Sequence, residues 1–504
     1  MLAFKAEAKE WVNKSLTTPS IGDGQASGLS AARWQGGSRP DSRSSLENPN
    51  ISVKEVNSYF IYRGVWCPWG CIASLVIVLS IVGMEQMAYG QYSQSCGDRL
   101  PPSPLLPSGE AALKVTPSIC VSERYDSNIF YRQATPGLTR NDFVTNVSPR
   151  LLVNHNSSYA SGVLDAAGFS ETYANNPDLN YFGTNDRLFL NLDNSIKRLL
   201  PNASMRITDV VRYTPAPPGY PSLATGTSPG DPANIPNAFA QGYLLQRTNN
   251  VTNTGTVLVS YATTAATSLE ASYTHALVRF GSSPGIPQQA QVTNLFDITS
   301  QTGTVGGIIR VSGLDMLNPK FSHTQFDASP VSGGTAFNTN VDTASLTWTR
   351  TLTPNLTAEL GGGGVVMDPG ITTYVANAAL IMRSQNNSAT ISYARSAYPR
   401  IQSTSTAGAT GGGDAMIVDM FSLSAIQNLS QQWQLTEGAN YSQGSSTNLN
   451  YESISASVSS YYWMTRIWSL ALSYDYMSYN TAFTTTGTAW ARNAVTFSLR
   501  ATWE

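Results

Sequence analysis

The sequence predicts an all-β protein, a closed antiparallel transmembrane β-barrel of about eighteen strands, with sixteen strands as the main alternative. Three observations support this prediction. The composition is low in charge and rich in Gly and aromatic residues, polar and apolar residues alternate in segments of about ten residues, and short connections take turns with long ones. A tilted strand of about ten residues is long enough to cross a bilayer. We expect the barrel to cover residues 112–504.

Charged residues make up 12% of the chain, about half the usual share of a soluble protein. Neutral polar residues and 40 Gly take their place, together with 10 Trp and 24 Tyr. This composition excludes coiled coils, helical bundles and charged disordered tails, all of which depend on Lys and Glu. The formal net charge is −2, so no basic surplus is present to neutralise a phosphate backbone, and we expect no nucleic-acid partner.

An apolar stretch near the N-terminus indicates export. Fourteen uncharged residues from Cys71 to Met84 would form about 21 Å of helix, which is short of the ~30 Å hydrocarbon core. A basic residue, Arg63, precedes this stretch, and small residues follow it up to Gly90. This pattern predicts a secretory signal peptide that is cleaved after Gly90. A membrane anchor that extends back through Trp66 is the alternative.

The part of the chain before the barrel therefore divides into three segments. Residues 1–60 are predicted to be disordered, or to result from a start codon assigned too far upstream. Residues 61–90 form the signal peptide, and residues 91–111 form a periplasmic segment that precedes the first strand.

Alternation at period two predicts strands, and it is clearest at the C-terminus. There the apolar positions Val495, Phe497, Leu499, Ala501 and Trp503 share one face, while Thr496, Ser498, Arg500 and Thr502 share the other. The same pattern recurs in the segments 188–193, 452–462 and 469–476. No window after Pro107 has a helical period.

The connections between these segments predict how the strands are joined. Short links, several of which contain turn-forming pairs such as Pro-Asn, are expected near positions 155, 201, 265, 313, 354, 386, 431 and 466. Longer connections rich in Gly, Pro, Ser and Thr are expected near 125–140, 174–184, 214–245, 281–293, 327–340, 400–414 and 479–489, with two short ones near Pro369 and Gly444. An outer-membrane barrel needs an even number of strands, with tight periplasmic turns and long outer loops.

The polar face of these strands favours a membrane barrel over a soluble sandwich. A bilayer leaves no partner for unpaired backbone groups, so the sheet has to close. The polar face is dominated by Ser, Thr, Asn, Gly and Arg, which suit a wet lumen better than a packed core. Trp433 and Trp468, which follow two of the short links, are expected at the membrane–water interface.

Cleavage after Gly90 would leave Cys96 and Cys120 as the cysteines of the mature chain. Disulfides form in oxidising compartments such as the one to which the signal peptide points. Cys96 and Cys120 are therefore a candidate structural disulfide. Two cysteines without nearby His or further Cys cannot complete a tetrahedral metal site.

The start of the predicted barrel resembles a known group of proteins. It reads Glu-Arg-Tyr-Asp-Ser-Asn-Ile-Phe at 123–130 and Asn-Asp-Phe-Val-Thr-Asn-Val-Ser-Pro at 141–149. These forty or so residues (112–149) resemble the opening hairpin of outer-membrane β-barrel porins of the "porin 2" type, which include barrels associated with exosortase and exopolysaccharide systems. The resemblance implies a place and an architecture more than an activity. One departure is Glu504, which follows Trp503 where such barrels usually end on Phe or Trp.

No catalytic, cofactor or metal motif is recognisable in the sequence. The three histidines His155, His275 and His323 are widely separated. A pairing of His275 with Ser272 is the weak basis for an alternative as an outer-membrane hydrolase, and a cation site at Asp414 and Asp419 is disfavoured. We expect a protein that is not an enzyme and has no cofactor. The Gly run 361–364 is expected where a strand passes close to another backbone.

Three arginines, Arg206, Arg350 and Arg500, are candidates for charges that line the lumen and tune ion selectivity. The alternative is that they pair with neighbouring carboxylates.

The predicted function is a porin-like channel in the bacterial outer membrane for small hydrophilic solutes, or a barrel that serves exopolysaccharide export. The alternative is a non-conducting surface scaffold or adhesin that binds polysaccharide through its outer loops, of which 214–245 is the longest. The expected partners are outer-membrane lipid, the barrel-assembly machinery through the C-terminal strand, and polysaccharide or small solutes.

Overall fold

The structure is a computed structural model that describes residues 113–130, 140–214, 249–281, 296–330, 336–368, 370–399, 415–446, 449–481 and 488–503. The chain divides into two compact units, Met1–Val65 and Trp66–Glu504, and every described residue belongs to the second. The predicted segments 1–60, 61–90 and 91–111 lie outside the described residues, so their boundaries remain predictions.

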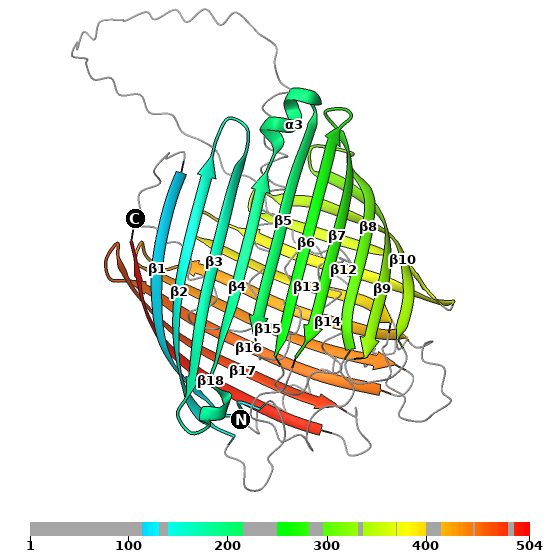
Figure 1. Cartoon of the computed structure of the whole chain (residues 1–504). Helices are drawn as coiled ribbons and strands as arrows, with labels where there is room; N and C mark the ends of the chain where they lie inside the picture. The colour runs from blue at the N-terminus through cyan, green and yellow to red at the C-terminus, as the bar shows by residue number, and fades with distance from the viewer. Residues whose placement is uncertain are drawn as a thin grey trace, which may run out of the picture. The chain divides into compact units, whose positions relative to one another are not determined.

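The described residues form eighteen strands (Figure 1). The first nine are β1 (Leu113–Asp126), β2 (Asp142–Asn156), β3 (Ser161–Tyr173), β4 (Tyr181–Asn191), β5 (Ala203–Thr214), β6 (Asn250–Ala262), β7 (Thr267–Phe280), β8 (Phe296–Arg310) and β9 (Asp315–Pro330). The other nine are β10 (Phe337–Thr353), β11 (Leu356–Met367), β12 (Ile371–Arg383), β13 (Asn387–Pro399), β14 (Ala415–Asn428), β15 (Trp433–Ser446), β16 (Leu449–Trp463), β17 (Trp468–Thr481) and β18 (Thr488–Thr502).

Each strand pairs antiparallel with its neighbours in the sequence, and β18 pairs with β1, which closes the sheet. The closing ladder runs from Ser118 opposite Thr502 to Asp126 opposite Ala494. Closure pairs the backbone at every strand and leaves no sheet edge to face lipid. The prediction of a closed antiparallel barrel of about eighteen strands is confirmed.

The strands are joined by eight short links at one end of the barrel, which we call the short-turn end, close to the predicted positions. Seven of these links use a Ser or Thr side chain that accepts a hydrogen bond from a backbone N–H two or three residues further on. One of these residues is Thr353, which accepts from the backbone N–H of Asn355. The other six are Ser157, Thr264, Ser312, Ser384, Ser430 and Thr465. Such local bonds stabilise a tight reversal.

Two short helical segments break the strand pattern. The link between β4 and β5 holds the helix α3 (Asp193–Leu199), where a tight turn was predicted. The Asp193 side chain accepts a hydrogen bond from the backbone of Met205, at 3.0 Å, which ties the helix to β5. A 3₁₀ turn (Pro177–Leu179) lies between β3 and β4. No helix in the described residues is both long enough and apolar enough to cross a membrane.

The two faces of the sheet differ in polarity. Along β1, Thr116, Ser118 and Ser122 are buried, whereas the intervening Val115, Ile119 and Val121 are exposed. In a closed barrel the exposed alternation faces outward and the buried alternation faces the interior. The register of all eighteen strands carries this assignment around the barrel.

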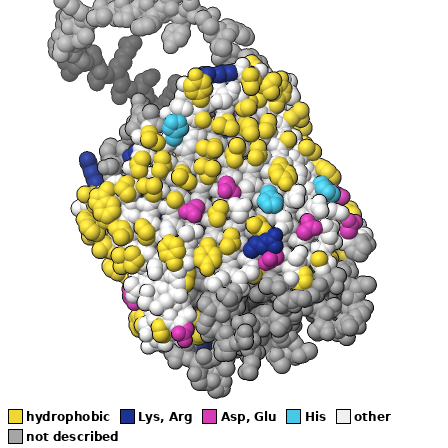
Figure 2. Space-filling view, in the orientation of Figure 1, with side chains coloured by type: hydrophobic (Ala, Val, Ile, Leu, Met, Phe, Trp, Pro, Cys, Tyr) yellow, Lys and Arg dark blue, Asp and Glu magenta, His cyan; other side chains and the backbone are white. Residues whose placement is uncertain are grey.

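The outer face carries an apolar band (Figure 2). On the visible face, hydrophobic side chains are dense towards the end that bears α3, and acidic side chains lie mostly in the middle and lower parts. Exposed aromatic residues at the short-turn end include Trp433, Tyr462, Trp468 and Trp503, which form the expected aromatic belt.

These features place the chain in the bacterial outer membrane. Barrels of that membrane close without an edge, turn an apolar band towards lipid, and keep short turns and both strand termini on the periplasmic side. Here β1 begins beside His155, next to the first short link, and the backbone N–H of Trp503 donates to the carbonyl oxygen of Pro117. Both ends of the barrel sequence therefore lie at the short-turn end, which is the periplasmic one.

Candidate functional site: the lumen of the barrel

Hydroxyl groups cover much of the inner wall. They pair across neighbouring strands, as in Thr302 with Thr324 at 2.9 Å, and Ser392 with Ser422 at 2.6 Å. The inner faces of β13, β14, β15 and β16, which we call the hydroxyl wall, carry no charged residue within the described range. Such a surface offers hydrogen bonds to water and polar solutes without a strong local charge.

Charged groups gather on a different part of the inner face. We call the inner faces of β17, β18 and β1–β5 the charged wall. Its members are Lys114, Arg124, Asp126, Asp142, Arg150, Asp165, Glu171, Arg187, Arg206, Arg212, Asp475, Arg492 and Arg500. Eight of these are basic and five are acidic. Elsewhere the described inner face adds Glu270, Arg310, Lys320, Glu359 and Arg383.

A buried ion pair spans the seam where the barrel closes. Arg492 of β18 donates from Nε and Nη2 to Asp126 of β1, with Nη2 to Oδ2 at 2.7 Å. Asp126 also accepts a hydrogen bond from the backbone N–H of Asn128 at 3.0 Å. Both charged side chains are less than a tenth exposed. Bidentate geometry makes this a strong contact between the first and last strands.

A second buried pair continues the network along the charged wall. Arg124 donates to both carboxylate oxygens of Glu171, at 3.2 and 3.1 Å. The hydroxyl of Tyr173 donates to the same carboxylate at 2.7 Å. Because both arginine and carboxylate are nearly buried, each neutralises the other. The part of this wall that is far from the short-turn end therefore carries little net charge.

Nearer the short-turn end, basic groups outnumber carboxylates. Arg150 donates to both oxygens of Asp165, with Nη2 to Oδ2 at 2.6 Å. Arg187 lies directly opposite Asp165 on β4. Arg500 donates to the Ser118 hydroxyl at 3.1 Å and interacts electrostatically with both Arg150 and Asp165. Three arginines thus surround one carboxylate.

Parts of the inner face are apolar at the end opposite the short turns, which we call the long-connection end. Tyr479 stacks between Tyr451 and Trp490, with ring centroids 5.7 and 5.9 Å away. All three rings are buried, and Met416, Val418 and Met477 pack with them. A second cluster around Phe326, Val365 and Met367 occupies another part of the same end. Apolar side chains that point inward narrow the polar part of the lumen here.

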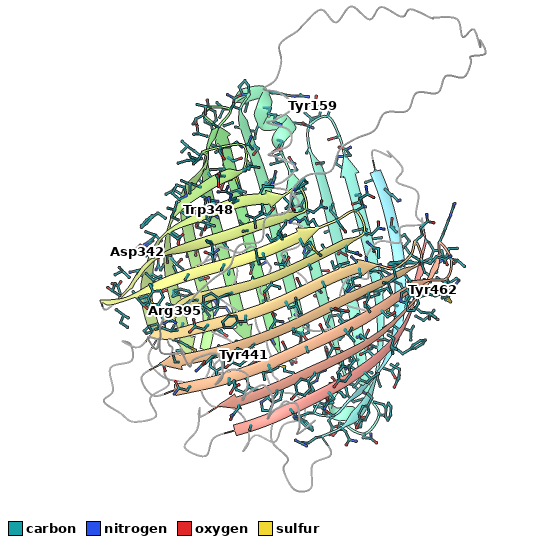
Figure 3. The ribbon with its side chains drawn as sticks, turned by 180° about the vertical axis from the view of Figure 1, so that it is seen from behind. Tyr159, Asp342, Trp348, Arg395, Tyr441 and Tyr462 are labelled. Carbon is teal, nitrogen blue, oxygen red and sulfur yellow. The ribbon has the colours of Figure 1, made fainter. Side chains whose placement is uncertain are left out.

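The structure places two of the three predicted lumen arginines inside and one outside. Arg206 and Arg500 lie on the inner face, opposite Asn191 and Cys120. Arg350 lies on the outer face, so its predicted position is wrong. It pairs with Asp315 at 3.6 Å, and the same carboxylate accepts a bond from Trp348 at 3.0 Å. Figure 3 shows Trp348 among the labelled side chains of this outer surface.

The outer face also carries the pair of Arg395 and Asp419, which the sequence did not predict. Arg395 donates to both oxygens of Asp419 at 3.0 and 2.9 Å, and its guanidinium lies 4.4 Å from the ring centroid of Tyr374. Asp419 is therefore engaged in an ion pair, and its suggested partner Asp414 lies outside the described residues. Arg395 and Tyr441 are labelled on this face in Figure 3.

The described residues do not bring together a catalytic group in the lumen. All three histidines point outward, because their register partners belong to the outer face. Ser272 and His275 are an odd number of residues apart on β7, so they lie on opposite faces and do not form a pair. No group of three or more His, Cys, Asp or Glu in the described ranges could hold a metal ion.

Cys120 faces the interior, is 3% exposed and is joined in a disulfide bond. The other three cysteines, Cys67, Cys71 and Cys96, all lie outside the described residues. The predicted pairing of Cys120 with Cys96 therefore remains a prediction.

Comparison with known proteins gives distant structural similarity alone. No protein-family model matches the sequence, and no curated protein matches it. The solved structures to which the chain is similar include OpdQ of Pseudomonas aeruginosa, with a TM-score of 0.36 and 10% identity over 78% of this chain and 98% of that one. They also include OccAB4 of Acinetobacter baumannii, with a TM-score of 0.36 and 10% identity over 77% and 98%. The siderophore receptor PirA of Pseudomonas aeruginosa has a TM-score of 0.37 and 7% identity over 78% and 80%. Similarity at this level carries no information about ligand or activity.

Proposed function

We propose that the protein forms a water-filled channel in the outer membrane for small hydrophilic solutes, without catalysis. The observation that supports this proposal most is the polarity of the inner wall of a closed eighteen-strand barrel. Barrels of sixteen to eighteen strands are wide enough to leave an aqueous channel. Hydroxyls and charges that line such a channel replace part of the hydration of a passing solute.

The test is electrical conductance of the purified, folded chain in planar lipid bilayers. We expect discrete steps of current that persist at low voltage. The matched control is the same preparation unfolded by heat, which should give no steps. Complete silence of the folded barrel would contradict the proposal.

Exopolysaccharide export is the finer form of this proposal. It is supported by the hydroxyl wall, whose Ser, Thr and Asn side chains match the hydrogen-bonding groups of sugars. Neutral oligosaccharides added to one side should reduce the current in a length-dependent way. An unchanged current at high sugar concentration would remove the support for export.

A non-conducting scaffold that binds polysaccharide through its outer loops is the second candidate. The apolar clusters that point inward at the long-connection end favour it, because they narrow the lumen. Deleting residues 215–237, while leaving the last residue of β5 (Thr214) in place, distinguishes the two candidates. A scaffold should lose polysaccharide binding, whereas a channel should keep or gain conductance.

We also propose that assembly of the barrel in the membrane depends on β18. This strand has the alternating polar and apolar pattern that the assembly machinery recognises in the C-terminal strand of such barrels. The apolar positions Val495, Phe497 and Leu499 are exposed on its outer face, where lipid and assembly factors would meet them.

A further inference from the structure

We infer that the lumen selects anions, with carboxylate- or phosphate-bearing solutes as the favoured class. This inference rests on the proposed function as a channel. It follows from how the fold sorts charges between its two faces, which the net charge of −2 for the whole chain does not reveal.

The inner face of the described strands is basic. It carries eleven basic and seven acidic residues, an excess of four positive charges, when the charged wall is taken together with Glu270, Arg310, Lys320, Glu359 and Arg383. A narrow, water-filled space lined by one sign of charge raises the local concentration of the opposite ion.

The outer face of the same strands has the opposite sign. It carries ten acidic residues, Glu123, Asp186, Asp209, Asp297, Asp315, Asp327, Asp342, Asp419, Glu437 and Glu452. Its basic residues on described strands are Arg279, Arg350 and Arg395. A preference for anions therefore cannot arise from charges outside the lumen.

The connections that the structure does not describe between β1 and β18 cannot reverse the sign. In sequence they contain five charged residues, Arg132, Asp231, Arg247, Arg400 and Asp414. Their sum is one positive charge, which has the same sign as the excess of the wall.

The excess is concentrated in the periplasmic half of the lumen. There, eight basic residues face three acidic ones, Asp165, Glu270 and Glu359. Glu359 interacts electrostatically with both Arg383 and Lys320, so two bases surround this carboxylate as three arginines surround Asp165. Guanidinium groups bind carboxylate and phosphate with paired hydrogen bonds, which gives these anions an advantage over chloride.

The test is the reversal potential of the folded full-length chain in a planar bilayer across a KCl gradient near 0.01 M, where the Debye length is about 30 Å and electrostatic screening is weak. We expect chloride to permeate at least about twofold better than potassium. Sodium phosphate and sodium succinate, added separately, should each reduce the chloride current. A barrel that conducts but prefers potassium, or has no preference, would overturn this inference and leave the channel intact. A barrel that does not conduct would overturn both.

Charge-reversal variants test whether the anion preference comes from the residues of the inner face. The double substitution Arg187→Glu and Arg206→Glu changes the inner face by four charges and should bring the permeability ratio close to one. The matched control is Arg279→Glu with Arg350→Glu, which makes the same change on the outer face, at side chains that are about half exposed. The control should keep the ratio of the unmodified chain. Equal shifts in both variants would contradict a selectivity set by the lumen.

Discussion

Asp126 is the residue whose contacts depend most directly on closure of the barrel. It belongs to β1 and accepts bonds from Arg492 of β18, while Arg124 lies 3.7 Å from the same carboxylate. Removing this carboxylate would therefore take away the counter-charge that Arg492 contacts, while Arg124 would keep its pair with Glu171. Breaking a buried pair from one side costs more than the pair contributes, because it leaves a buried charge without compensation.

We predict that Asp126→Asn destabilises the barrel by about 3 kcal/mol, since both partners are nearly buried. The measurement is the unfolding transition in detergent, followed by the change in gel mobility between folded and unfolded barrel. Glu123→Gln is the matched control on the same strand, because Glu123 faces outward and is exposed. Equal stability of the two variants would show that the seam does not depend on this ion pair.

The disulfide of Cys120 gives a second prediction. If Cys96 is the partner, Cys96→Ser should leave Cys120 as a free thiol, and peptide mapping of the unreduced mature chain should find Cys96 and Cys120 in one linked peptide. Cys67→Ser with Cys71→Ser serves as the control and should leave the link intact. A link between Cys120 and either of those two cysteines would contradict both the pairing and the predicted cleavage.

Single residues also show where sequence reasoning reached its limit. Arg350 stands on the same alternation as Leu346, Trp348 and Leu352, so counting by two from these apolar neighbours would have placed it outside. No alternation or spacing in the sequence indicates the ion pair of Arg492 with Asp126. It joins positions 366 residues apart, and their meeting depends on closure and register.

At the scale of elements, the glycine run of β11 shows how one strand packs against its neighbour. Gly363 faces inward, and a Cβ atom there would collide with the carbonyl oxygen of Ala344 and lie 2.7 Å from the Cα of Ser345. Gly364 faces outward, with nothing within 4 Å of the corresponding position. The predicted close approach of this strand to another backbone is therefore present at Gly363.

We predict that Gly363→Ala destabilises the barrel by about 1–3 kcal/mol, because β10 has to shift to accommodate the methyl group. Gly364→Ala, one residue further on, should change stability by less than about 0.5 kcal/mol. Thermal unfolding of both variants in the same detergent compares them directly. A Gly364→Ala variant as unstable as Gly363→Ala would show that strand propensity, rather than the close approach, sets the effect.

The elements themselves were predictable because each strand alternates over its own length and each link carries its own turn residues. The eighteen strands and the positions of the eight short links follow from such local patterns. The helix α3 could not be predicted from such a pattern, because its seven residues are too few to show a helical period. It is also held by a contact outside its own segment, the hydrogen bond from the backbone N–H of Met205 to the Asp193 side chain.

At the scale of the whole molecule, closure produces two environments from one sheet. Every strand contributes alternately to a lipid-facing and a lumen-facing surface, so one polypeptide of nearly neutral charge acquires an acidic exterior and a basic interior. The two-faced wall could be predicted from alternation. The sign of the lumen charge could not, because it depends on the side to which each of some thirty charged residues points.

The two-faced wall is tested most directly by the chemistry of adjacent positions on one strand. Ser457 of β16 faces inward, next to Val458, which is exposed on the outer face. In liposomes, Ser457→Cys should react with a water-soluble maleimide and Val458→Cys should not, whereas a lipid-soluble maleimide should show the reverse preference. Equal labelling of the two variants by the water-soluble reagent, or a preference for Val458→Cys, would contradict the account of a lipid-facing exterior and a watery lumen.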